Sequence, residues 1–120
     1  MAGTYGTTEY EANELSQLVA GSVHLQKQVT IGAGNLKRGT VLAVDADGNY
    51  VQLNPSATDG TEVPRAILAE DADASNGPVK AQAYFVGKYR LKDLIWPDGI
   101  TDAQKQSAIL GLQDRGIIVE

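Results

Sequence analysis

The sequence predicts a mainly β domain with one short α-helix near its C-terminus, preceded by an extended N-terminal arm. Three observations predict this class. From residue 23 onward, short apolar runs follow one another, separated by Gly, Asp, Asn and Pro residues that favour turns. One stretch near the end of the chain combines helical spacing with capping residues at its start. The first 20 residues are small and polar and are interrupted by glycines.

The expected arm covers residues 1–20, and the β-rich domain covers residues 21–120. The arm has too few apolar groups to offset the entropy lost on ordering. A short helix is the alternative, because Thr8 and Glu11 could form a capping box and apolar residues follow at near-helical spacing. We expect instead an extended arm that is mobile alone and orders against a partner.

The amino-acid composition excludes several classes of function. A chain of 120 residues fits one domain, and with one Trp and one Phe its core must be mostly aliphatic. The absence of Cys excludes disulfides and a thiol nucleophile, and a single His cannot build a His-based zinc site. The net charge of −5 argues against a protein that binds nucleic acid by neutralising phosphates. We find no membrane-spanning stretch and expect no signal peptide, so the protein is expected to be intracellular or released by lysis.

The first strand is expected over residues 23–31, with alternating apolar and polar residues. Its expected buried face consists of Val23, Leu25, Val29 and Ile31. Glycines at 32 and 34 end it. Residues 41–44 and 50–53 predict two further strands, joined by a hairpin turn at Asp47-Gly48-Asn49.

The next strand is expected at residues 66–69, followed by an acidic surface loop over residues 70–78. The clearest strand runs over residues 79–85, and its apolar face is Val79, Ala81, Ala83 and Phe85.

The rest of the chain predicts helical structure and a closing strand. Residues 91–95 predict one helical turn, which ends at Trp96-Pro97. Thr101 and Gln104 form a capping box for the helix, and Gly116 ends it. Its core face is expected to be Ile109, Leu110 and Leu112, and residues 117–119 are expected to form the last strand.

None of the groups that could carry chemistry predicts an enzyme. His24 lies on the polar face of a strand with no apparent acid–base partner, so a surface or interface role is favoured. Asp45, Asp47 and Asn49 alternate as in a calcium loop, but Gly48 is in the wrong position for one, which favours a hairpin turn. The acidic residues after position 69 are interpreted as a solvated loop, with weak cation binding as the alternative.

Other catalytic patterns are also missing. Paired carboxylates could cleave glycosides, but the chain has few aromatic residues to line a sugar cleft. No helix or Lys-Ser/Thr pair follows Gly32-Ala-Gly34, and no serine lies in a Gly-x-Ser-x-Gly motif. We therefore expect no catalytic residues, no metal and no cofactor. Exposed strand edges combined with an arm favour an assembly protein that forms oligomers.

Several segments in order resemble the lambda-type phage head decoration (capsid stabilisation) proteins. They are Thr58-Asp59-Gly60, Ile67-Leu68-Ala69 and the stretch from Gly87 to Pro97, supported by residues 36–42 and 50–55. The resemblance covers about residues 23–120.

The resemblance implies a β-clip-like fold and a homotrimer on the outer surface of an icosahedral head, at three-fold positions. Such proteins bind the major capsid protein after the shell expands and stabilise it against the pressure of packaged DNA. The resemblance also implies that the N-terminal arm is disordered in the free protein and orders on the shell, often by pairing with a strand of the capsid protein. The arm in this chain lacks the prolines of the lambda arm, so only the role of the arm is carried over.

Candidate capsid-binding residues follow from this role. Tyrosines supply large rings at low entropic cost. The candidates in the arm are Thr4, Tyr5, Tyr10, Leu15, Leu18 and Val19. Trp96 and Pro97 are expected either in the core or at a trimer contact, and Lys37 and Arg38 either in a solvated turn or in a salt bridge to the shell.

A second interpretation is a β-clip domain that binds a small molecule or a sugar. Residues 36–42 also suit such folds, and a concave pocket lined by polar groups would identify one.

Overall fold

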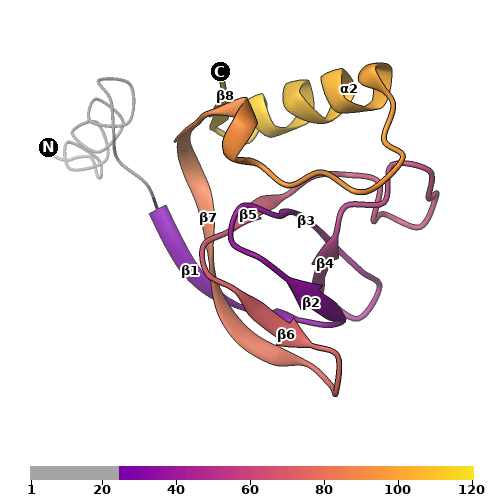
Figure 1. Cartoon of the computed structure of the whole chain (residues 1–120), viewed down its shortest axis with the longest axis vertical. Helices are drawn as coiled ribbons and strands as arrows, with labels where there is room; N and C mark the ends of the chain where they lie inside the picture. The colour runs from indigo at the N-terminus through magenta and orange to yellow at the C-terminus, as the bar shows by residue number, and fades with distance from the viewer. Residues whose placement is uncertain (1–24) are drawn as a thin grey trace, which may run out of the picture.

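The structure, a computed structural model, describes residues 25–120 (Figure 1). It is mainly β with a single α-helix near the C-terminus, as the sequence predicts. The strands are β1 (Leu25–Ile31), β2 (Gly34–Leu36), β3 (Val41–Val44), β4 (Tyr50–Gln52), β5 (Ala66–Leu68), β6 (Ala72–Ala74), β7 (Val79–Tyr89) and β8 (Ile117–Val119). The helical segments are a 3-10 turn, η2 (Leu91–Asp93), and the helix α2 (Asp102–Gln113).

Five strands pair in a circuit in the order β1, β4, β3, β5 and β7, and β7 pairs back to β1. The long strand β7 organises this circuit, because β1 and β5 pair antiparallel to it. The circuit closes between β1 and β4 through one parallel pairing, Ile31 with Tyr50. β8 adds in parallel to the C-terminal end of β7, and β2 and β6 form a separate two-stranded sheet. Figure 1 shows α2 and β8 at one end of the molecule and the β2–β6 pair at the other.

The core has two clusters on opposite faces of β3 and β5. The barrel cluster contains Leu42, Ala66 and Leu68 together with residues of β1, β2, β6 and β7. The helix-side cluster contains Val41, Ala43 and Ile67 together with Leu53, Leu94, Ala108, Leu112 and Ile117. Strands buried on both faces have continuous apolar sequences rather than alternating ones, which explains the runs at 41–44 and 66–69.

Turn chemistry confirms the predicted hairpin between β3 and β4. The Asp45 carboxylate accepts hydrogen bonds from the backbone N–H groups of Asp47 and Asn49, both at 2.9 Å. Both hydrogen bonds lie within the turn itself, as expected for a hairpin turn. They support the prediction of a hairpin over that of a calcium loop. The capping box of α2 is also confirmed: Gln104 N donates to Thr101 Oγ1 at 3.1 Å, and Thr101 N donates to Gln104 Oε1 at 3.0 Å.

Three predictions of local structure are wrong. Leu25 is 50% exposed, because the register between β1 and β7 shifts between Leu25 and Gln26 and changes the face of the strand. The expected acidic loop contains a strand, β6, in which Ala72 and Ala74 are buried and only Asp73 faces solvent. Leu110 is 56% exposed, since the buried face of α2 passes through Ala108 and Leu112.

Candidate functional site

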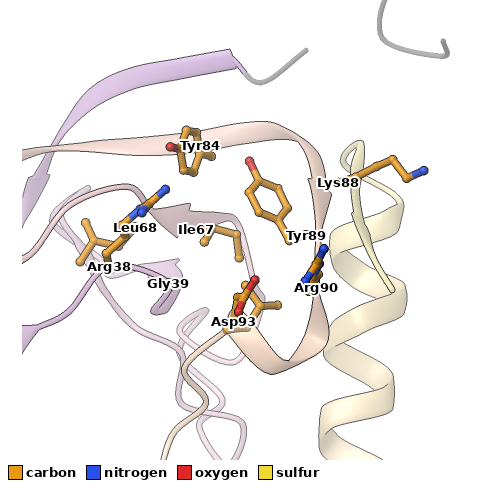
Figure 2. A pocket seen from close by; sticks show the side chains of 10 residues that line it. Arg38, Gly39, Ile67, Leu68, Tyr84, Lys88, Tyr89, Arg90 and Asp93 are labelled. Atoms are coloured by element: carbon orange, nitrogen blue, oxygen red, sulfur yellow. The ribbon is translucent and has the colours of Figure 1, made fainter. Parts of the chain in front are cut away.

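The described residues line a cavity of about 650 Å³ that is open to solvent on one side, beside the C-terminal half of β7. Its lining comes from four places in the chain: the turn at Arg38-Gly39, β5, β7 with the residue after it, and η2 with Leu94. Figure 2 shows these side chains around the opening, with the two tyrosines Tyr84 and Tyr89 along β7. The cavity is therefore built by segments that are far apart in the sequence.

Gly39 allows these segments to meet. Its φ is +98°, and a Cβ there would lie 2.5 Å from the carbonyl oxygen of Asp93. The close approach is fixed by Ile95 N, which donates to Gly39 O at 2.8 Å, and by Val41 N, which donates to Ile95 O at 3.2 Å. Only glycine combines this backbone angle with this separation.

Positive charge predominates around the cavity. Arg38, Lys88 and Arg90 line it, opposed by one lining carboxylate, Asp93. The Lys88 ammonium forms an ion pair with Glu120 at 2.9 Å, and Figure 2 shows its side chain directed outward. Arg38 and Arg90 make no ion pair with any residue from 25 to 120, although Asp71 accepts a hydrogen bond from the Arg38 backbone N at 2.8 Å. The entrance of the cavity therefore carries a net positive charge, although the protein as a whole is acidic.

The tyrosines give the cavity a neutral aromatic wall. The rings of Tyr84 and Tyr89 lie with centroids 5.6 Å apart, and the Tyr89 hydroxyl donates to Val86 O at 3.2 Å. Burial raises the pKa of Tyr89 above its usual value, with a smaller contribution from Tyr84. Both effects disfavour a phenolate here, so the positive charge of the arginines is not offset by Tyr89.

The candidate residues from the sequence fall in two groups. Those of the arm, together with His24, lie outside the described residues. Trp96 is half-buried against the helix-side cluster, Pro97 is also half-buried, and the Lys105 ammonium lies 5.9 Å from the centre of the indole ring. The indole N–H is buried and has no hydrogen-bond partner among residues 25–120.

Sequence reasoning missed the gathering of charge at this cavity. The sequence predicts Arg38 in a turn or in a salt bridge to the shell, and it points to Lys88 and Arg90 only through the resemblance of residues 87–97. Lys88 and Arg90 are two residues apart, a spacing that places side chains on one face of an extended segment, but the strand predicted from the sequence ends at residue 85. Nothing local in the sequence indicates that the turn at residue 38 lies across the same opening.

Other site types find no support in the described part of the chain. Between residues 25 and 120 there is no group of three or more His, Asp or Glu side chains placed to hold a metal ion. No helix in the same range is long and apolar enough to span a membrane.

Comparison with known proteins identifies the family. No curated protein matches the chain. The sequence profile of the bacteriophage lambda head decoration protein D family matches residues 8–117, which is nearly the whole chain and includes most of the expected arm. Proteins of this family are structural components of the phage capsid. The protein belongs to the bacteriophage lambda head decoration protein D family.

Proposed function

We propose that this capsid decoration protein binds as a homotrimer to the major capsid protein, on the outer surface of the expanded head at its three-fold positions. There it stabilises the shell against the pressure of packaged DNA, after synthesis in the host cytoplasm. The observation that carries this proposal is the family match over residues 8–117.

The architecture of the body suits this role. A circuit of five paired strands with a core on both faces of β3 and β5 gives a rigid body that need not change shape on binding. The described chain begins at Leu25, opposite Val86, and its last strand ends opposite Tyr89. Both ends of the described chain therefore lie beside the same end of β7.

We propose that the arm supplies most of the contact with the capsid. Ordering an arm costs conformational entropy, so one arm binds weakly. Three arms on a single trimer raise the avidity by about 10²–10⁴ without any new kind of contact. Tyr5 and Tyr10 are the expected anchors, with Thr4, Leu15, Leu18 and Val19 packing along the shell.

Deletion of residues 1–20 tests the role of the arm. The shortened protein should fold with an unchanged unfolding midpoint, remain a trimer and no longer bind expanded capsids. Circular dichroism, sedimentation velocity and capsid co-sedimentation measure these three properties. Binding of the shortened protein at the level of the full chain would contradict the proposal.

A matched pair of variants refines the test. Tyr5→Ala with Tyr10→Ala should weaken binding by about 2 kcal/mol or more per arm, as expected for anchor residues. Thr7→Ala with Gln17→Ala changes the same arm at two polar positions and should leave binding nearly unchanged. Equal effects of the two pairs would contradict the assignment of the tyrosines.

A further inference from the structure

The turn between β6 and β7 contains the chain's only Asn-Gly pair, Asn76-Gly77. An asparagine side chain is attacked most easily by the backbone nitrogen of a following glycine, because glycine has no Cβ to hinder ring closure. Asn76 is exposed, and its side chain forms no hydrogen bond with residues 25–120. Figure 1 shows this turn at the end of the molecule opposite α2. The Asn76 amide is therefore open to water.

The backbone nitrogen of Gly77 is held only weakly. It donates to Ala74 O at 3.3 Å, which is longer than the usual range of about 2.7–3.2 Å for N–H···O bonds. Gly77 has a φ of +133°, and nothing lies within 4 Å of a Cβ built on it. Glycine moves between backbone regions at low energetic cost. The turn can therefore change its local angles without a clash and bring Gly77 N to the Asn76 side chain.

The other asparagines of the described chain lack this combination. Asn35 lies in β2, and the next backbone nitrogen belongs to Leu36, which is buried. Asn49 precedes Tyr50, a residue of β4 that pairs with both β1 and β3. Asn54 is followed by a proline, which has no N–H to give up. Ring closure at these three positions is hindered by the fold or by the following residue.

We propose that Asn76 is a site of spontaneous deamidation in the folded protein, with water as the only other reactant. Gly77 N attacks Cγ of Asn76 and forms a C–N bond. The bond from Cγ to Nδ2 then breaks, and Nδ2 leaves as ammonia with the proton that Gly77 N has lost. Water opens the resulting five-membered imide at either of its carbonyls. Opening at Cγ gives aspartate, and opening at the main-chain carbonyl of residue 76 gives isoaspartate.

Either product changes the turn. Both add one negative charge to the formal net charge of −5, in the same turn as Asp73, whose carboxylate already accepts a hydrogen bond from Ser75 N at 3.0 Å. Isoaspartate also adds a methylene group to the main chain between Ala74, which is buried in β6, and the start of β7 at Val79. We therefore expect the isoaspartate form to unfold at a lower temperature. This inference does not depend on the proposed function.

Incubation of the purified, full-length protein at mildly basic pH tests the inference. Peptide mass spectrometry should find the mass increase of an NH2-to-OH replacement at Asn76, while Asn35, Asn49 and Asn54 serve as internal controls and stay unmodified. Methylation by an isoaspartyl methyltransferase distinguishes isoaspartate from aspartate. A synthetic peptide of residues 72–80 gives the rate without the fold. We expect the folded protein to react within about tenfold of the peptide, because only one long hydrogen bond has to break.

Three variants complete the test. Gly77→Ala places a Cβ beside the attacking nitrogen and should slow the reaction several-fold. Gly48→Ala is its matched control, since Gly48 also has a positive φ and open space around its Cβ position, and it should leave the rate at Asn76 unchanged. Asn76→Gln keeps Gly77 and should abolish the modification at residue 76. The inference is overturned if Asn76 stays unmodified while the peptide reacts, if the other asparagines react equally fast, or if Gly77→Ala reacts at the natural rate.

Discussion

At the scale of single residues, Gly39 shows how one position can determine both stability and the shape of a site. Gly39 has a positive φ and no Cβ, so the carbonyl of Asp93 can approach it closely. This close approach allows η2 to lie against the start of β3. The sequence predicts only a possible turn at Lys37 and Arg38 beside this glycine, because the approach of residues 93–95 depends on contacts more than 50 positions away. Local pattern predicts the turn and not the contact.

Gly39→Ala should lower the free energy of unfolding by more than about 2 kcal/mol, of which left-handed strain accounts for about 1–2 kcal/mol. The remainder comes from the clash with the Asp93 carbonyl. Gly48→Ala is the matched control, since Gly48 has a φ of +83° and open space around its Cβ position. Urea unfolding of both variants measures the difference in their free energies of unfolding. Equal decreases in the two variants would show that the close approach at residue 39 does not contribute to stability.

A carboxylate in the loop after β4 should give a measurable pH dependence. The side-chain hydroxyl and then the backbone N–H of Thr61 donate to Asp59, and these bonds lower the pKa of Asp59. A depressed pKa in the folded state stabilises the fold above the unfolded pKa of about 4, and this stabilisation is lost as the pH falls through the folded value.

Asp59→Asn should therefore give a shallower loss of stability than the natural protein between about pH 5 and pH 2. Thr61→Val removes the main donor, keeps the charge, and should also make the loss shallower. Urea unfolding across this pH range measures the slopes. An unchanged slope in both variants would show that the Asp59–Thr61 bonds do not stabilise the folded protein.

At the scale of elements, α2 shows which part of a helix can be predicted. Its start was predictable, because the Thr101–Gln104 capping box is a local pattern. Its buried face was not, because the helix has apolar residues at 108–110 and 112 and therefore offers two possible faces. Contact with Pro64 at Gly111 and burial of Ala108 and Leu112 select between them.

Leu112→Ala should lower the free energy of unfolding by about 2–5 kcal/mol, because Leu112 is fully buried in the helix-side cluster. Leu110→Ala, two residues earlier in the same helix, should change it by less than about 0.5 kcal/mol, since Leu110 is 56% exposed. Thermal or urea unfolding of the two variants compares them directly. A larger loss at Leu110 would contradict the orientation of the helix.

The short strands β2 and β6 mark the limit of prediction for elements. Each has three residues, and their sequences, Gly-Asn-Leu and Ala-Asp-Ala, resemble turns. They form strands because they pair with each other, with Asn35 opposite Asp73, and because both alanines of β6 complete the barrel cluster. Long alternating strands such as β7 were predictable, whereas strands that exist only through tertiary pairing were not.

At the scale of the whole molecule, the described chain begins beside one end of β7, where Leu25 lies opposite Val86, and residues 1–24 carry three glutamates and neither Lys nor Arg. The class of fold and the family were predictable, since the order of turns and apolar runs is a property of the whole chain. The positive cavity was not, because its lining comes from residues 38–39, 67–68, 84–90 and 93–94, which only the folded chain brings together.

Sedimentation of the purified protein with and without expanded, undecorated capsids tests the proposed function most directly. We expect the free protein to sediment as a trimer and to bind the shells at a saturable stoichiometry. Unexpanded shells serve as the control and should bind less protein, because the proposed site forms on expansion. A monomer that does not sediment with expanded shells would contradict the proposed function.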